Sequence, residues 1–208
     1  MSNISYAVFC DFDGTITNND LLDIIVDIFH EPEYRLNIDN KILNKEIEHN
    51  KALEILFSKV NISFIEAVNK INIKCNNKVI NNTFESFYNN CKTNNIPIYI
   101  ISGGFKLFIK HYLPFVCEQD IYANDIYIDE TNKWNLSFIT KSLDKELIIN
   151  TICNDRQYSY MKYYGDGISD VGVVNIKNIH LYAKSKSFLE KYCKENNISY
   201  QPFTDFNL

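Results

Sequence analysis

The sequence lacks the patterns that mark several large classes of proteins. Its 21 lysine and arginine residues are outnumbered by 26 aspartate and glutamate residues, and they form no basic block. A protein that binds the phosphate backbone of nucleic acids usually carries such a block. No apolar run approaches the roughly 20 residues that a membrane-spanning helix needs. We therefore expect neither a nucleic acid nor a membrane as the partner.

The cysteines also follow no recognisable motif. Six are present, and none belongs to a Cys-x-x-Cys pair, which excludes the common zinc-binding and dithiol motifs. Most lie among apolar residues, as buried thiols do. A strand-like segment starts at Tyr6, so no signal peptide is expected before it. These features predict a soluble protein of the cytoplasm with reduced thiols.

What the sequence does contain is an alternation of apolar strands and amphipathic helices. Strand-like apolar runs cover residues 6–10, 96–101, 160–164 and 179–183. Helical spacing of apolar residues covers 84–91, 105–112, 143–152 and 188–193. This alternation predicts an α/β fold in which helices cover both faces of a parallel sheet, giving three layers.

The first two strands are separated by about eighty residues, far more than one connecting helix requires. Helical stripes at 21–29, 42–60 and 64–71 predict a helical cap over residues 16–80. The core domain would then consist of residues 1–15 and 81–208. Residues 124–138 alternate between polar and apolar side chains, which favours a hairpin or an edge of the sheet.

Two carboxylates follow the first strand. Asp11 and Asp13 are two residues apart, so on an extended chain both side chains point the same way. Two like charges so close favour a bound cation or one protonated group. Gly14 then permits a sharp turn. A metal-free acidic turn is the alternative interpretation of this pattern.

Two further carboxylates, Asp166 and Asp170, follow the third strand in Gly165–Asp170. If this strand neighbours the first, all four carboxylates meet at one edge of the sheet. Hard oxygen ligands of this kind suit Mg²⁺, whose coordination a substrate phosphate can complete. The alternative is a glycine-rich turn in which Asp170 caps the next helix.

Phosphate-binding candidates lie elsewhere along the chain. Ser102-Gly103-Gly104 is predicted to end the second strand and open a helix, where backbone amides and the Ser102 hydroxyl could bind an anion. Lys145 begins a helical stripe and could neutralise a phosphate oxygen, with Lys141 as its rival. Taken alone, Ser102 is better explained as the cap of an ordinary strand-to-helix turn, and Lys145 could be a solvated lysine.

The order of these motifs is more specific than any one of them. The sequence reads Asp-x-Asp-Gly-Thr, then a serine after a strand, then a lysine, then Gly-Asp-x-x-x-Asp. In this order the chain resembles the haloacid dehalogenase-like hydrolase superfamily over almost its whole length. The resemblance implies a Rossmann-like core with an inserted cap, a bound Mg²⁺ and hydrolysis of a small phosphorylated metabolite.

The resemblance also implies roles for individual residues. Asp11 would be the nucleophile that forms an aspartyl phosphate, and Asp13 the general acid and base. Asp11, Asp166 and the carbonyl of Asp13 would hold Mg²⁺. Ser102, the Gly103 amide and Lys145 would bind the phosphoryl oxygens, and Asp170 would orient Lys145 or a metal-bound water. A carboxylate at Asp13 favours phosphate esters over halides.

Within the superfamily, a cap after the first strand resembles that of the phosphoserine phosphatase group. Asp20 stands where that group uses an acidic residue for the substrate amine, although it also reads as a helix N-cap. The cap arginine of that group is absent from 51–57, since Arg35 is the cap's only arginine. The motifs around Asp11 and Ser102 and the ending 200–206 resemble methylthiopentenyl-phosphate phosphatases more closely.

Several substrates and two other functions are compatible with the same residues. The substrate could be methylthiopentenyl-phosphate-like, phosphoserine-like or phosphoethanolamine- and phosphocholine-like. A phosphotransferase or phosphomutase would use the same pair of aspartates, and a non-catalytic binding protein would keep only the fold.

Overall fold

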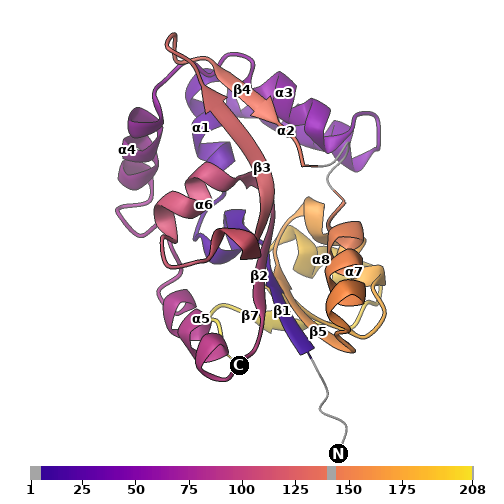
Figure 1. Cartoon of the computed structure of the whole chain (residues 1–208). Coiled ribbons are helices and arrows are strands. Elements are labelled where there is room, and N and C mark those ends of the chain that lie inside the picture. The colour runs from indigo at the N-terminus through magenta and orange to yellow at the C-terminus, as the bar shows by residue number, and fades with distance from the viewer. Residues whose placement is uncertain (1–5, 140–143, 208) are drawn as a thin grey trace, which may run out of the picture.

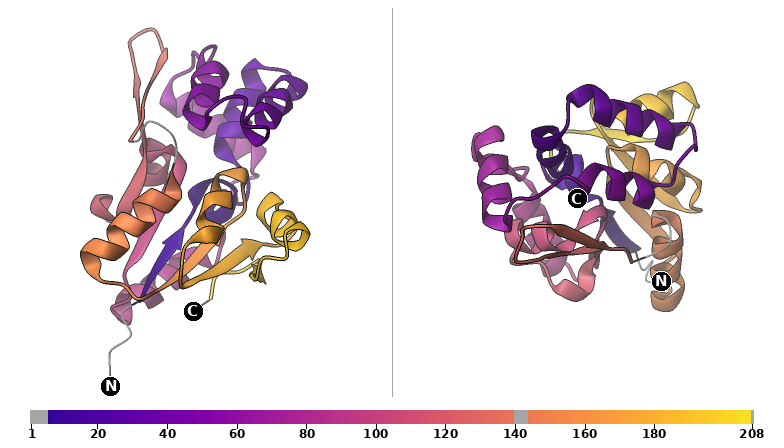
Figure 2. Two further views of the ribbon diagram at one scale, coloured as in Figure 1. Left: turned by 90° about the vertical axis from the view of Figure 1, so that its right-hand side faces the viewer. Right: turned by 90° about the horizontal axis from the view of Figure 1, so that it is seen from above.

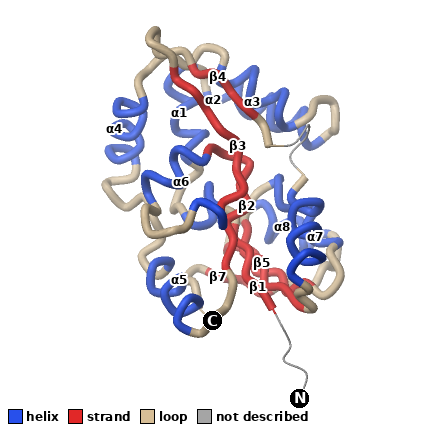
Figure 3. The backbone as a smooth tube through the Cα atoms, in the orientation of Figure 1, coloured by secondary structure: helices blue, strands red, loops and turns tan. Residues whose placement is uncertain are grey.

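The computed structural model describes residues 6–139 and 144–207. Lys141, the predicted rival of Lys145, lies outside these residues. Seven strands form one sheet in the order β4-β3-β2-β1-β5-β6-β7. All neighbouring pairs are parallel except β3 and β4, which are antiparallel. The predicted α/β fold with a parallel sheet is therefore confirmed, with one antiparallel strand at its edge. Figure 3 shows the strands in red and the helices around them in blue.

The elements of the sheet and its covering helices follow one another along the chain. The strands are β1 (Tyr6–Cys10), β2 (Ile98–Phe105), β3 (Ile121–Ile128), β4 (Trp134–Ser137), β5 (Tyr160–Gly165), β6 (Ile179–Lys184) and β7 (Gln201–Phe203). The helices outside the segment between β1 and β2 are α6 (Lys106–Tyr112), α7 (Lys145–Arg156) and α8 (Phe188–Glu195), and α5 (Phe84–Thr93) directly precedes β2.

The side chains of β1 show why the sheet is buried on both faces. Ala7 and Phe9 belong to one apolar cluster, together with residues of α7 and α8. Val8 and Cys10 point to the opposite face, into a cluster with residues of α5 and α6. Because successive side chains of a strand alternate in direction, a continuous apolar run is needed for a strand with helices on both faces. Figure 1 shows the resulting three layers.

Strand β1 lies at the point where the strand order reverses. The chain runs from β1 to β2 and β3 on one side, and then returns to β5 on the other side of β1. Ligands of such sheets bind at the carboxyl ends of the strands beside this reversal. Asp11 stands at this position, since its backbone N–H donates to the carbonyl of Tyr164 in the neighbouring β5 at 2.9 Å.

Four helices form the segment between β1 and α5. They are α1 (Leu21–Phe29), α2 (Pro32–Leu43), α3 (His49–Phe57) and α4 (Phe64–Lys74). Figure 2 shows them beyond the carboxyl ends of the strands. Where this segment leaves and rejoins the sheet domain, Thr17 pairs with Ile80 in an antiparallel bridge. Because the two ends of this segment lie next to each other, we propose that residues 16–80 form a cap and that residues 1–15 and 81–208 form the core.

The β3–β4 hairpin reaches from the sheet to these helices. The indole N–H of Trp134 donates to the carbonyl of Ile62 at 2.8 Å. The Trp134 ring also lies 5.5 Å from the ring of Phe57 in α3 and 6.4 Å from that of Phe105 in β2. The predicted hairpin at 124–138 is thus confirmed, and its tryptophan packs the cap against the core.

Two details of the predicted elements are wrong, and two elements were not predicted. The segment 42–60 is not one helix, because α2 ends at Leu43 and α3 starts only at His49. Helix α2 itself and the short β7 were not predicted. Ser102-Gly103-Gly104 does not end the second strand, because β2 continues through Phe105 with a shift of register against β3. Among the described residues, no helix is both long and apolar enough to cross a membrane.

Candidate active site

The turn after β1 carries Asp11 and Asp13 and depends on Gly14. Gly14 has a φ of 75°, in the left-handed region that glycine adopts without strain. A Cβ atom at this position would also clash with the carboxylate of Asp166. Thr15, in the same turn, donates to Asp166 Oδ1 at 2.6 Å and lies 3.4 Å from Asp11 Oδ2. The turn therefore brings the carboxylates that follow β1 and β5 together.

Lys145 lies at the centre of a buried ionic network. Its Nζ atom is 2.6 Å from Asp11 Oδ1 and 2.6 Å from Asp170 Oδ1, and its side chain is only 1% exposed. Asp144 caps α7 by accepting from the Leu147 N–H at 2.8 Å, which fixes the helix start that carries Lys145. Burial disfavours the charge of Lys145, but Asp11 and Asp170 raise its pKa above the ordinary lysine value. Described residues engage two of the three ammonium N–H groups, which leaves a third that could donate to an anion.

Asp170 is saturated with hydrogen bonds. Its Oδ1 accepts from Lys145 and from the Tyr163 hydroxyl at 2.6 Å each. Its Oδ2 accepts from the backbone N–H groups of Asp166 and Gly167 at 2.9 Å each. A carboxylate offers about four acceptor positions, and all of them are used. Asp170 is thus suited to hold Lys145 and the β5 turn in place.

The environment of Asp13 favours its protonated form. Burial, reinforced by the carboxylates of Asp20 and Asp11, raises the pKa of Asp13 well above its usual range. The Ser102 hydroxyl lies 3.4 Å from Asp13 Oδ2 and accepts from the Gly104 N–H at 2.9 Å. A Cβ atom on Gly104 would clash with the Asp13 carboxylate. A carboxyl group that holds its proton at neutral pH is suited to act as a general acid.

The carboxylates of this site fit a divalent cation. One oxygen atom each from Asp11, Asp166 and Asp170 lies within 4.8 Å of the others. Burial and the charges of Asp11 and Asp170 raise the pKa of Asp166 well above its usual range. Burial raises the pKa of Asp11 to about 7, although Lys145 opposes this shift. Such repulsion is relieved by a cation, and hard oxygen donors suit Mg²⁺. Because Asp170 has no free acceptor position, Asp11 and Asp166 are the better ligands of this group.

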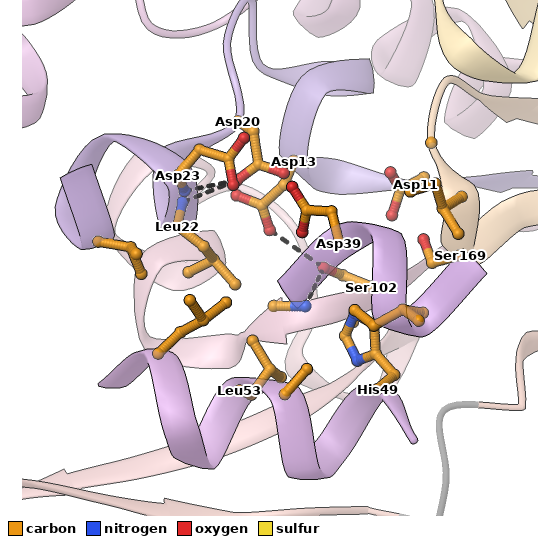
Figure 4. A pocket seen from close by; sticks show the side chains of 18 of the residues that line it. Asp11, Asp13, Asp20, Leu22, Asp23, Asp39, His49, Leu53, Ser102 and Ser169 are labelled. Atoms are coloured by element: carbon orange, nitrogen blue, oxygen red, sulfur yellow. Dashed lines mark hydrogen bonds between the residues drawn. The ribbon is translucent and has the colours of Figure 1, made fainter. Parts of the chain in front are cut away.

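A cavity of about 250 Å³ opens between this site and the helices α1–α3. Asp11, Asp13, Ser102 and Gly103 line its core side, so the structure gathers these predicted site residues around one space (Figure 4). Asp166 also borders the cavity. Lys145 and Asp170 lie behind it, in contact with Asp11 or with each other.

Asp20 lines the cap side of the same cavity. Its Oδ1 accepts from the N–H groups of Leu22 and Asp23 at 2.9 and 3.0 Å, which confirms that it is the N-cap of α1. The N-cap role does not exclude substrate contact, since the residue also faces the cavity.

Three residues that support the site were not predicted as functional. Thr15 was visible only as part of the Asp-x-Asp-Gly-Thr motif, and Tyr163 only as one residue of an apolar strand. Lys184 donates to the carbonyls of Gly14 and Thr17 and so fixes the turn after Asp11. No local signal could have identified Lys184, because its partners are about 170 residues earlier in the chain.

Fold and site together define an α/β protein whose acidic centre lies at the carboxyl ends of the strands of a largely parallel sheet. Residues 8–174 match the family described as haloacid dehalogenase-like hydrolase. The chain therefore belongs to this family, and the recognition and fold class predicted from the sequence are confirmed.

Named relatives cover almost the whole chain. "Pdp3-interacting factor 1" of Schizosaccharomyces pombe is 32% identical over 96% of this chain and 90% of its own length. The 2-hydroxy-3-keto-5-methylthiopentenyl-1-phosphate phosphatase of Bacillus cereus is 31% identical over 98% of this chain and 93% of its own length. The chain is thus an enzyme of the hydrolase family with phosphatases among its relatives.

Solved structures agree on the fold. A phosphoserine phosphatase, described as a phospho-aspartyl intermediate analogue, superposes with a TM-score of 0.74. The superposition covers 97% of this chain and 94% of the other, at 15% sequence identity. At this identity the likeness shows the shared fold alone.

Proposed function

We propose that this protein is a Mg²⁺-dependent phosphomonoesterase that passes the phosphoryl group of its substrate through Asp11 to water. The observation that carries this proposal is the contact of Asp11 Oδ1 with Lys145 Nζ at 2.6 Å at the wall of the cavity. A carboxylate held at a strand end beside a fixed ammonium group is suited to attack a phosphorus atom whose oxygens need neutralisation.

The reaction has two steps. An oxygen atom of Asp11 attacks phosphorus, the ester bond breaks, and Asp13 gives its proton to the leaving alkoxide. Asp13, now ionised, then takes a proton from water, whose oxygen attacks the aspartyl phosphate. Inorganic phosphate leaves and Asp11 is regenerated. The raised pKa of Asp13 supports this double role, because burial and the carboxylates of Asp20 and Asp11 favour the protonated form that the first step needs.

Mg²⁺, when bound, supplies positive charge that neutralises the phosphoryl oxygens. We propose Asp11, Asp166 and the Asp13 carbonyl as its ligands. Ser102, the Gly103 amide and the free N–H of Lys145 would bind phosphoryl oxygens, and Asp170 would keep Lys145 in position.

The substrate we propose is a small phosphorylated metabolite of the cytoplasm. The cap wall of the cavity carries the apolar side chains of Leu22, Val26, Leu53 and Leu56. None of the described residues that line the cavity is a lysine or arginine, which supports a methylthiopentenyl-phosphate-like substrate over a phosphoserine-like one. The Bacillus cereus relative is named for the former. A phosphoethanolamine- or phosphocholine-like substrate would instead use the acidic Asp20.

Two other functions use the same fold. A phosphotransferase or phosphomutase would return the phosphoryl group to an organic acceptor, and a non-catalytic binding protein would release none. The deciding experiment is phosphate release from a panel of small phosphomonoesters, with Mg²⁺ and with a chelator, by wild type and Asp11→Asn. We expect release that needs metal and is lost in the variant. Equal release by a well-folded Asp11→Asn would contradict the mechanism, and release from no ester would favour the other functions.

A further inference from the structure

The cap side of the cavity is apolar along α3, with one polar exception. Ala52, Leu53, Leu56 and Phe57 of this helix line the cavity and are almost fully buried. His49, the first residue of α3, lines the same wall. Figure 4 shows its ring projecting from α3 on the side of the cavity where Ser102 lies.

The His49 ring carries a buried nitrogen without a partner. Its Nδ1 atom is inaccessible and has no hydrogen bond to any described residue. Buried polar atoms of proteins are almost always paired, so an unpaired one points to a ligand or to water. The residue that carries this atom lines the cavity that also borders the proposed nucleophile Asp11.

His30, in the same cap, shows what a structural histidine looks like in this protein. Its Nε2 atom lies 2.9 Å from the carbonyl oxygen of Leu56. Its ring stacks on Tyr34 with the centroids 4.7 Å apart. His30 is satisfied by the protein alone, whereas His49 is not, so packing does not account for a histidine at position 49.

The charge state of His49 limits what it can bind. Burial, reinforced by the nearby Lys145 ammonium, lowers the pKa of His49 to about 4. A neutral imidazole offers one donor and one acceptor, which matches a hydroxyl or carbonyl oxygen. Because the ring is neutral, it offers no positive charge to pair with a substrate carboxylate. The cap arginine, Arg35, is already paired with Asp23, Asp27 and Asp39.

We propose that His49 determines specificity by hydrogen-bonding an uncharged oxygen on the carbon chain of the phosphate ester. The inference rests on the proposed phosphomonoesterase activity and names its substrate class: esters of neutral hydroxy or keto alcohols with an apolar remainder. The phosphoryl group lies at Asp11, the oxygen at His49, and the apolar part against Leu53 and Leu56. Esters that carry a carboxylate near the phosphate are poor substrates, because the described lining offers acidic groups and no free cation to receive it.

The test compares esters that differ in this oxygen. Dihydroxyacetone phosphate has a neutral keto oxygen and a hydroxyl, propyl phosphate has neither, and phosphoserine adds a carboxylate. We expect His49→Leu to lower kcat/KM for dihydroxyacetone phosphate about fivefold to tenfold, the worth of a neutral hydrogen bond, and to leave propyl phosphate nearly unchanged. His49→Gln, whose amide keeps a donor and an acceptor, should restore most of the loss.

Lys51→Met is the matched control, because Lys51 lies on the same helix with an exposed side chain paired to Glu54. It should leave both esters unaffected. An equal loss on both esters in His49→Leu, or no loss on either, would overturn the proposal. A preference of wild type for phosphoserine would do the same.

A binding measurement covers the case in which His49→Leu does not fold. In Asp11→Asn, which should bind without turnover, the nitrogen resonances of the His49 ring should shift on addition of dihydroxyacetone phosphate and not of propyl phosphate. Absence of a selective shift would overturn the role of His49. Failure of the proposed function is distinguishable, since wild type would then release phosphate from no ester.

Discussion

Two cations of this protein are each surrounded by aspartates, but in different environments. Lys145 in the core contacts Asp11 and Asp170, and all three side chains are at most 6% exposed. Arg35 in the cap pairs with three carboxylates, of Asp23, Asp27 and Asp39, at 2.7 to 3.2 Å. The arginine is 15% exposed and its partners are 29 to 42% exposed, so water screens this second cluster.

The difference explains why similar ionic groups have different uses. In the buried network, charges act on one another with little screening, so Lys145 can neutralise a nucleophile and a phosphoryl group. In the cap, Arg35 balances three carboxylates and is not among the residues that line the cavity. The core thus supplies the positive charge for the reaction. The cap side of the cavity supplies apolar side chains, the neutral His49 and the carboxylates of Asp20, Asp23 and Asp39, but no cation among the described lining residues.

The largest expected effect comes from removing the buried cation. Lys145→Met keeps the volume but leaves Asp11 without its partner and the phosphoryl group without a donor. We expect kcat to fall about 10²- to 10³-fold, as for the loss of one transition-state donor. Steady-state kinetics with Mg²⁺ would measure it. Lys141→Met is the comparison: a loss there, with Lys145→Met active, would assign the phosphate-binding role to Lys141.

A smaller effect is expected when only the support of Lys145 is weakened. Asp170→Asn removes one of its two anionic partners, and we expect a 10- to 100-fold loss of kcat/KM, typical of groups that position a catalytic residue. Asp27→Asn is the matched change in the Arg35 cluster and should have little effect on the same assay. Similar kinetics for the two variants would show that the two clusters do not differ as described.

Removing the cap cation tests the other side of the comparison. Arg35→Met leaves three carboxylates facing one another, which should lower the free energy of unfolding by roughly 1–2 kcal/mol, given partial screening. Denaturant unfolding would measure this loss, while kcat at saturating substrate should change little. A collapse of kcat with unchanged stability would mean that Arg35 acts in the reaction.

The comparison extends to His49, which should leave stability at neutral pH unchanged and affect it only in acid, because its low pKa reflects burial and the charge of Lys145. The folded protein keeps the ring neutral to about pH 4, whereas the unfolded chain binds a proton near pH 6.5. The stabilisation is therefore complete above pH 6.5 and lost as the pH falls toward 4. Wild type should lose stability more steeply than His49→Gln over this range. Parallel curves would mean that His49 is solvated.

Part of this structure was predictable because local patterns decided it. Helix α1 matches the predicted range 21–29, since its apolar stripe and its Asp20 cap are both local. Helix α2 was missed because its residues carry almost no stripe, and only Ile38 among those described is buried. Ser102-Gly103-Gly104 resembles a turn by composition, yet it continues β2 as an irregular stretch between the pairs that Ile101 and Phe105 form with β3. The side chain of Asn124 in β3 donates to the carbonyl of Gly103 there, a long-range contact that composition does not predict.

The site also contains residues that local patterns predicted and residues that they did not. Asp11, Asp166 and Asp170 were found because each follows a strand that the apolar pattern predicts. His49 and Tyr163 were not, because their contacts depend on how α3 docks on the core and on which face of β5 turns toward Asp170. These contacts join residues far apart in the sequence, so the spacing of residues along the chain does not predict them.

The central claim is that Asp11 becomes phosphorylated during turnover. Acid quenching of wild type during hydrolysis of its best ester, followed by peptide mass spectrometry, tests it directly. We predict one added phosphoryl group on the peptide that contains Asp11, dependent on Mg²⁺ and absent from Asp11→Asn. Sustained phosphate release with no phosphoryl group trapped on that peptide, or with the group on another residue, would contradict the account.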